Sequence, residues 1–474
     1  MTITLPILRL KIISITYLSC QLTIFEEFLI FESQKIYSMK RIFLHFFLAF
    51  SVSLAVQAQK TTIDKALFEL PDVIFKEIKS SDSTVRTFEL QVKQPLDHQH
   101  PDKGYFYQRA FLSHKGFDRP MLMYISGYGQ DRVFNNELTP LLGANQLSIE
   151  HRFFGTSVPE SLDYSYLNLE QATADLHYIN ELFKKIYAGK WVSTGISKGG
   201  ATTIFYKYFF PNDVDAAIPY VAPINREYED KRIYSFLSSV GTEACRKKIF
   251  EFQKRMFHNR DKVLPLLKMY SEGAKLTFTY LSLEQAFEYS VLEYPFAFWQ
   301  YGSSCEEIPA ETSSLEEAVL YLNKVSDIQS FSDASIDTYL PHYYQSATQM
   351  GYYSYLTEPF KDDLKALPLK PHPSAAILPK VKGIATPFDG SLLKKVNEWV
   401  AKDGNRIAYI YGADDTWTAT GVPSSDKVDA VWFFMKGKNH RSARVAQMTP
   451  EEKKKFVATL ERWLGTKISN KEAE

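Results

Sequence analysis

The chain has 474 residues, of which 45% are hydrophobic and 15% aromatic, enough to bury a large core and to form more than one lobe. Its 55 Lys and Arg residues balance 55 Asp and Glu residues, which removes the electrostatic argument for binding nucleic acid. After residue 60 no apolar run is long enough to cross a bilayer, so we expect no stable membrane insertion of the mature chain.

The N-terminus has the pattern of a secretory signal. Met39-Lys40-Arg41 is a basic start, residues 42–55 are largely apolar, and Val56-Gln57-Ala58 ends in a small residue. We expect residues 39–58 to be a signal peptide that is cleaved after Ala58, and residues 1–38 to be upstream sequence read in frame. The mature protein would then be exported, either periplasmic or extracellular. An uncleaved anchor is the alternative.

Two cysteines remain after such a cleavage, Cys245 and Cys305. In an exported protein a pair of cysteines is expected to form a disulfide, and two buried thiols are the alternative. Two cysteines without clustered histidines make no zinc site. We expect neither a metal nor a cofactor.

Strand and helix patterns alternate in the first half of the chain. Apolar alternation predicts an antiparallel pair of strands, and continuous apolar runs predict buried strands separated by helices. The predicted strands are 88–94, 105–112, 121–125, 147–151, 192–195 and 216–221, and the predicted helices are 168–187 and 201–210. This alternation predicts a parallel sheet that is covered on both faces.

The pattern changes after Pro223. Residues 225–375 are charged, aromatic, helical in period and poor in strands, which predicts an inserted helical cap domain. Strand and helix patterns then return, with a helix at 391–401, strands at 406–410 and 431–435, and a last helix that begins with the capping box Thr449–Glu452. The predicted core therefore has two parts, 59–224 and 376–474, on either side of the cap.

Gly195-Ile196-Ser197-Lys198-Gly199-Gly200 is the most informative segment. A serine flanked by glycines between a strand and a helix is typical of the nucleophile elbow, where a Cβ at either glycine would collide in the tight bend. The segment predicts an α/β-hydrolase fold with Ser197 as the nucleophile. A serine hydroxyl is a weak nucleophile, so the fold must also supply a base, an orienting acid and donors for the oxyanion.

In α/β-hydrolases the order along the chain is serine, acid, histidine. Four histidines follow Ser197, and His440 alone lies in a loop between the last predicted strand and the last helix, where the base is needed. Asp414 and Asp415 both follow the preceding strand, and their proximity does not separate them. One oxyanion donor is expected from the backbone N–H of Lys198, and the other from the Gly127–Gly129 loop, at Gly127 or Tyr128. A tight turn is the alternative function of that loop.

The chain is similar to the secreted bacterial serine peptidases of the S37 family, which are tripeptidyl aminopeptidase-like, and more distantly to the S28 family of prolyl carboxypeptidase and dipeptidyl peptidase. Ser197-Lys198-Gly199-Gly200 is typical of the bacterial branch, whereas the other branch usually has Tyr in the second position. The acid of that other branch precedes Pro-Trp, and Asp415-Thr416-Trp417 matches it with Thr for Pro, which favours Asp415. The segments that carry the resemblance are 94–98, 150–157, 166–175 and 292–301.

The resemblance implies an exopeptidase that releases di- or tripeptides from the N-terminus of short peptides, often with a proline preference. Glu293 is then a candidate partner for the α-amino group of the substrate, and a structural pair within the cap is its alternative. Glu150 and Arg152 are expected to form a buried ion pair beneath the site.

The alternatives are prolyl carboxypeptidase-like or esterase activity on the same fold, and a non-catalytic peptide-binding protein. The charged, aromatic cap argues against lipid substrates, and the intact Ser, Asp and His set argues against binding alone. The P1 preference, the product length and the oligomeric state stay open.

Overall fold

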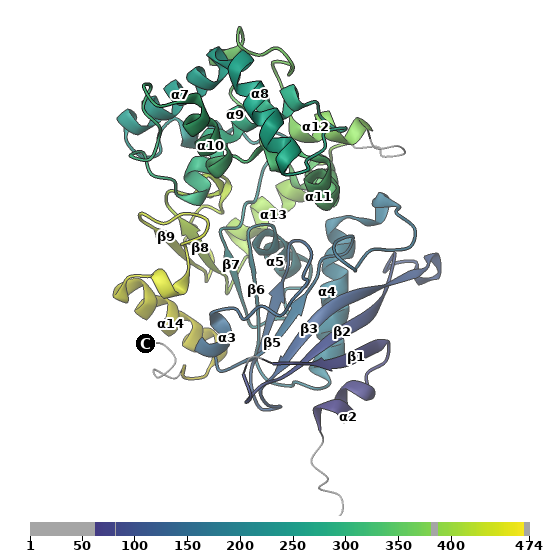
Figure 1. Cartoon of the computed structure of the whole chain (residues 1–474). Coiled ribbons are helices and arrows are strands. Elements are labelled where there is room, and N and C mark those ends of the chain that lie inside the picture. The colour runs from purple at the N-terminus through teal and green to yellow at the C-terminus, as the bar shows by residue number, and fades with distance from the viewer. Residues whose placement is uncertain (1–61, 81, 381–386, 469–474) are drawn as a thin grey trace, which may run out of the picture. The chain divides into compact units, whose positions relative to one another are not determined.

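The computed structural model describes residues 62–80, 82–380 and 387–468 (Figure 1). The chain divides into two compact units, Met1–Ala66 and Leu67–Glu474. The described part of the first unit is residues 62–66, where helix α2 (Ile63–Phe68) begins. The predicted signal peptide and the segment before it lie outside the described residues, so both stay predictions. The sheet and the helices that follow α2 belong to the second unit.

The described residues form a nine-stranded sheet in the order β1-β2-β3-β5-β4-β6-β7-β8-β9. The pairs from β1 to β5 are antiparallel, and the pairs from β5 through β4 to β9 are parallel. The strands are β1 (Val73–Ile78), β2 (Arg86–Pro95), β3 (Tyr105–His114), β4 (Met121–Ile125), β5 (Asn145–Ile149), β6 (Trp191–Ile196), β7 (Ala216–Tyr220), β8 (Ala408–Gly412) and β9 (Val431–Met435). The predicted strands are confirmed within a few residues.

Strand β1 is not among the strands that the sequence predicts. It lies at the edge of the sheet, and none of its residues is fully buried. Its sequence lacks the apolar run that marks β7 and β8, which are buried along their whole length.

Helices cover both faces of the sheet, as the pattern predicts. On one face, Leu169, Ile204 and Val396 pack together with Tyr409 of β8. On the other face, Leu138 and Phe456 pack with Ile218, Val192 and Phe433 of the strands. The helices that contribute are α3 (Leu138–Leu141), α4 (Leu169–Lys184), α5 (Lys198–Phe209), α13 (Ser391–Lys402) and α14 (Pro450–Leu464). This is the α/β-hydrolase fold that the elbow segment predicts.

The segment between β7 and α13 is helical (Figure 1). Its central helix α9 buries Phe287, Tyr294 and Phe298 among the apolar faces of its neighbours, including Phe252 of α7 and Leu322 of α10. The helices are α6 (Arg232–Leu237), α7 (Glu243–His258), α8 (Arg260–Gly273), α9 (Leu283–Tyr301), α10 (Leu315–Val325), α11 (Asp333–Gln345) and α12 (Pro373–Ile377). The domain boundaries at 225 and 375 stay predictions.

Short turns of helix complete the described chain. They are the 3₁₀ turns η1 (Pro101–Lys103), η2 (Tyr164–Tyr166), η3 (Ile328–Phe331), η5 (Glu358–Phe360), η6 (Leu378–Lys380), η7 (Thr416–Thr420) and η8 (Val445–Gln447), and the π-helical turn η4 (Ser346–Met350).

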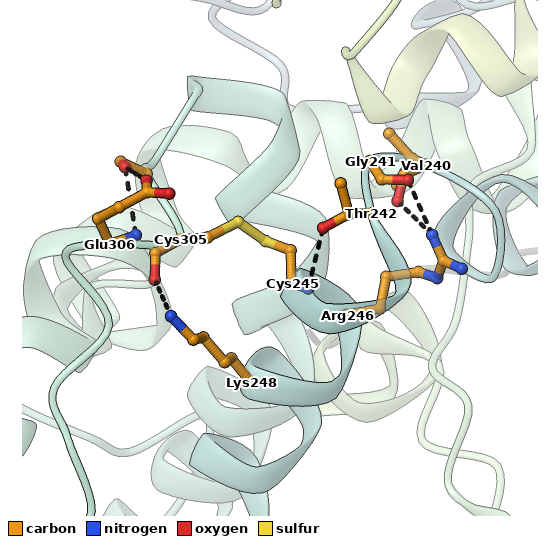
Figure 2. The surroundings of a disulfide bond; sticks show 9 residues. Val240, Gly241, Thr242, Cys245, Arg246, Lys248, Cys305 and Glu306 are labelled. Carbon is orange, nitrogen blue, oxygen red and sulfur yellow. Dashed lines mark hydrogen bonds between the residues drawn. A yellow bond between two sulfur atoms is a disulfide. The ribbon is translucent and has the colours of Figure 1, made fainter.

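Cys245 and Cys305 are joined in a disulfide, with their Cα atoms 5.6 Å apart (Figure 2). The bond ties the first turn of α7 to the segment that follows α9. Lys248 of α7 also donates to the Cys305 carbonyl at 3.4 Å. Two contacts from α7 thus hold Cys305, shortly after α9, and Gln300 near the end of α9 accepts the backbone N–H of His440 at 3.0 Å.

Candidate active site

Ser197 lies in the sharp bend between β6 and α5, with a φ of 58° and a ψ of −123°. A positive φ is strained for a residue with a side chain, and it turns the hydroxyl out of the strand. A Cβ at Gly195 would overlap the carbonyl oxygen of Gly199, and one at Gly199 would overlap that of Ile125. The bend therefore needs glycine at both places, for the steric reason given from the sequence.

His440 and Asp415 form a direct contact of 2.7 Å between Nδ1 and Oδ2. The Asp415 side chain is fully buried, and its other oxygen accepts the backbone N–H of Trp417 at 3.1 Å. Asp414 faces a different environment, where burial raises the pKa of its carboxyl, and its backbone N–H donates to Lys438 at 3.0 Å. The structure thus brings Asp415, rather than Asp414, against the histidine.

The loop around His440 is fixed by contacts from both sides. The His440 N–H donates to the carbonyl of Gln300 in α9 at 3.0 Å, and the Arg444 guanidinium donates to the His440 carbonyl at 3.1 Å. Glu137 accepts the backbone N–H groups of the two residues after Arg444 at 2.8 and 2.9 Å. These contacts fix the backbone of His440. Because Asp415 contacts Nδ1, the ring nitrogen Nε2 is the one that Asp415 leaves open.

Ser197, Asp415 and His440 all follow the carboxyl ends of parallel strands: β6, β8 and β9. The carboxyl ends of parallel strands lie at the same edge of a sheet, which is where open α/β sheets place their ligands. The three predicted residues are therefore on one edge, with the Asp415–His440 contact formed.

The predicted oxyanion loop packs on the first turn of α5. A Cβ at Gly127 would lie 2.5 Å from the backbone nitrogen of Gly199, so this close approach requires glycine. Lys198 N–H is the first amide of α5, which has no acceptor in the helical pattern. The Tyr128 N–H makes a long contact of 3.3 Å with the Ser126 hydroxyl. The loop and the elbow are thus in direct contact.

Glu293 projects from α9 and accepts hydrogen bonds from two tyrosines. The Tyr353 hydroxyl lies 2.9 Å from both carboxylate oxygens, and the Tyr355 hydroxyl lies 2.9 Å from one of them. Burial raises the pKa of Glu293 from 4.5 to about 7, although both tyrosine bonds act to lower it. In the described part of the chain no cation pairs with this carboxylate. Glu293 is thus paired within the cap, as the structural alternative expects, although with two hydroxyls and not with a cation, and its contact with a substrate amine stays a prediction.

Tyr301, the last residue of α9, lies close enough to both Glu293 and Asp415 to feel their charges. Burial is the main cause that raises the pKa of Tyr301, and the negative charges of Glu293 and Asp415 both raise it further. Tyr301 also lies under the Arg441 guanidinium, next to His440 in the chain, at 4.5 Å. One tyrosine thus lies within electrostatic reach of both carboxylates.

The predicted ion pair between Glu150 and Arg152 is wrong. Glu150 pairs with Arg109 of β3 at 2.7 Å, and Arg152 pairs with Asp175 of α4 at 2.7 Å. The carboxylates of Glu150 and Asp175 are fully buried, and in each ion pair the two residues come from elements that are distant in sequence. Nothing in the local pattern indicated them, and the same holds for the two tyrosines that bind Glu293.

Within the described residues, no group of three or more His, Cys, Asp or Glu side chains is arranged to hold a metal ion. Over the same residues, no helix combines the length and the apolar character needed to span a membrane.

The comparisons with known proteins identify the family of the chain. The family model of PS-10 peptidase S37 matches residues 57–473. A prolyl tri/tetrapeptidyl aminopeptidase of Streptomyces mobaraensis is 30% identical over 420 residues, which are 87% of each chain. A probable serine protease of Arabidopsis thaliana, EDA2, is 28% identical over 51% of this chain and 53% of its own, and the human thymus-specific serine protease is 27% identical over 31% and 33%. The chain belongs to peptidase family S37 and is a serine-type peptidase.

Proposed function

We propose that the protein is an exported serine aminopeptidase that releases di- or tripeptides from the free N-termini of short peptides. The observation that supports this most is the 2.7 Å contact between His440 and the buried Asp415, in a fold that presents Ser197 at a nucleophile elbow. The three residues follow one another in the chain in the order of a Ser-Asp-His triad, and the contact between acid and histidine that such a triad needs supports the proposal.

In this mechanism the Ser197 Oγ attacks the scissile carbonyl while His440 takes the hydroxyl proton at Nε2. The carbonyl oxygen becomes an oxyanion, for which the N–H groups of Lys198 and of the Gly127–Tyr128 loop are the donors. When the tetrahedral intermediate collapses, the C–N bond breaks and His440 returns the proton to the leaving amine. A water molecule, deprotonated by His440, then hydrolyses the acyl-enzyme and restores Ser197.

Asp415 holds His440 in the tautomer that carries the proton on Nδ1, and it stabilises the imidazolium that forms in each half of the reaction. Its burial and its single orientation, fixed by the Trp417 N–H, suit this function. Trp417 packs edge-on against Phe296 of α9, which links the acid to the helical segment.

Glu293 supports the aminopeptidase polarity. A carboxylate that is held by two hydroxyls and has no cationic partner among the described residues can accept the α-ammonium group of a substrate. The match to the Streptomyces mobaraensis enzyme, named a prolyl tri/tetrapeptidyl aminopeptidase, supports the same polarity. The helical segment that carries Glu293 would set the length of the product, because it fixes the distance from the ammonium to Ser197.

A panel of peptides tests the proposal. Each peptide is offered with a free and with an acetylated N-terminus, together with simple esters, and kcat/KM is measured for the wild type and for Ser197→Ala. We expect cleavage of the free-amine peptides alone, and none by the variant. Equal cleavage of acetylated peptides and esters would make the enzyme an esterase or an endopeptidase, and activity that survives in Ser197→Ala would exclude the triad. N-terminal sequencing of exported material tests the cleavage after Ala58.

A further inference from the structure

The side chain of Lys198, directly after the nucleophile, is almost completely buried. A buried ammonium is normally paired with a carboxylate, since the loss of hydration is costly. No described carboxylate forms an ion pair with Lys198, and its Nζ donates to the carbonyl oxygen of Gly127 at 2.8 Å. The amine of Lys198 is thus hydrogen-bonded to the carbonyl of Gly127, in the loop that packs on the elbow.

The surroundings of the Lys198 amine are aromatic rather than anionic. Its Nζ lies 5.5 Å from the ring centre of Tyr128 and 5.2 Å from that of Phe154, which are cation–π distances. Burial lowers the pKa of Lys198 well below its ordinary value. His151 and His342, whose pKa values are lowered first by burial and then by the nearby lysine, complete the environment. With or without its charge, the amine keeps N–H donors for the Gly127 carbonyl.

Two further side chains hold the rest of this loop. The Ser126 hydroxyl donates to the carbonyl of Tyr128 at 3.0 Å. Glu150, fully buried, accepts the backbone N–H of Gln130 at 2.6 Å. Lys198 is the one of the three that comes from the elbow itself, so its contact sets where the loop lies relative to Ser197.

We propose that the Lys198 side chain is a positioning residue for the oxyanion site, which it aligns by holding the carbonyl of the Gly127–Tyr128 peptide. The inference rests on the function proposed above. Because a peptide group is planar and trans, fixing its carbonyl also fixes the direction of the Tyr128 N–H. A donor on the carbonyl also polarises the peptide and strengthens its N–H as a donor. The substrate oxyanion would then be bound by two amides, the Lys198 N–H and the Tyr128 N–H that Lys198 orients. The Tyr128 N–H would exchange its long 3.3 Å contact with the Ser126 hydroxyl for the oxyanion.

Replacing Lys198 with Met keeps the length and the apolar stem and removes the donor. Removal of an oxyanion donor costs about 100- to 1000-fold in kcat, so the loss of a residue that orients one should lower kcat by about 10- to 100-fold. The KM should stay within about twofold, because the interaction strengthens as the oxyanion develops. The affinity for a peptide boronate, which mimics the tetrahedral state, should fall by the same factor as kcat. The affinity of Ser197→Ala for an uncleaved peptide should not change when Lys198→Met is added.

Lys207→Met is the matched control. Lys207 lies at the other end of α5, is also buried, and also donates to backbone carbonyls, those of Pro211 at 2.5 Å and Val214 at 2.7 Å. A general effect of removing a buried amine from α5 would appear equally in this variant. We expect a comparable change in melting temperature with kcat retained. An equal loss of kcat in the two variants, or a change in KM alone for Lys198→Met, would overturn the proposal.

If Lys198→Met does not fold, a second pair of variants tests the same proposal. Lys198→Tyr and Lys198→Phe differ by one hydroxyl, and the resemblance noted above places Tyr at this position in the related branch. The Tyr variant should keep a higher kcat than the Phe variant, and equal values would count against the proposal. Fluorophosphonate labelling of the wild type at Ser197 distinguishes a failure of the proposed function from a failure of the Lys198 proposal. If the wild type is not labelled, the proposed function is wrong. If the wild type is labelled and Lys198→Met keeps its kcat, only the proposal for Lys198 is wrong.

Discussion

The Glu293→Gln variant should separate substrate recognition from chemistry. Gln keeps the shape of the side chain and can still accept a bond from Tyr353 or Tyr355, but it cannot carry a negative charge. A hydrogen bond to a charged group contributes about 1.5–3 kcal/mol, and 1.4 kcal/mol is a factor of ten. We therefore expect kcat/KM for free-amine peptides to fall by about 10- to 150-fold. The rate of inactivation by a fluorophosphonate without an amine should stay unchanged.

The pH dependence of this effect follows from the raised pKa of Glu293, about 7 in the free enzyme. Recognition needs the ionised carboxylate and the protonated amine of the substrate, whose pKa is about 7.7–8.0. Dividing the peptide kcat/KM by the fluorophosphonate inactivation rate removes the pH dependence that the two reactions share, because both depend on the reactivity of Ser197. In the wild type this ratio should rise through pH 7, pass a maximum near pH 7.5, and fall above it. In Glu293→Gln the rise should be absent.

Stopped initial-rate assays between pH 5.5 and 9 measure both quantities on the same preparations. The reasoning would be refuted if the variant lost fluorophosphonate reactivity as much as peptide activity, since Glu293 would then support the fold or the triad. It would also be refuted if acetylated and free-amine peptides lost activity equally. Tyr355→Phe, which removes one bond to the carboxylate, is a graded control and should shift the rise to higher pH.

Three further outcomes are expected. Asp415→Asn should lower kcat by about 10⁴-fold in peptide hydrolysis, and Asp414→Asn should change it by less than about tenfold; the reverse order would exchange their assignments. The double change of Cys245 and Cys305 to Ser opens a crosslink between residues 60 apart and should destabilise the fold by about 4 kcal/mol, seen as a lower melting temperature in calorimetry. The raised pKa of Glu293 stabilises the folded state below about pH 4.5, and this stabilisation is lost as pH rises through about 7. At pH 8 Glu293→Gln should therefore be more stable than the wild type by about 3 kcal/mol in urea unfolding, with the difference closing toward pH 4.5, and a constant difference would contradict the pKa argument.

The elbow and the order of the elements were predictable because they are local. The two glycines beside Ser197 carry a steric requirement that can be read from the sequence, and the structure places carbonyl oxygens where their Cβ atoms would be. Strands β4 and β7 were found because burial on both faces favours a continuous apolar run. Strand β1 lacked this signal because it is an exposed edge.

Choices that depend on contacts distant in sequence were not predictable in the same way. Asp414 and Asp415 are adjacent, and the geometry of the loop after β8 alone decides which of them reaches His440. Glu150 and Arg152 have opposite charges close together in the chain, yet each is neutralised by another element, β3 or α4. The lysine after the nucleophile showed no sign in the sequence that its amine would be buried against Gly127.

Mass analysis of the products of one peptide tests the proposed aminopeptidase activity. A peptide of six to eight residues is incubated, with its N-terminus free or acetylated, with the wild type and with Ser197→Ala. We expect the wild type to release a di- or tripeptide from the N-terminus of the free peptide and to leave the acetylated peptide intact. We expect the variant to release nothing. Release from the C-terminus, cleavage of the acetylated peptide at the same rate, or release by Ser197→Ala would contradict the proposed activity.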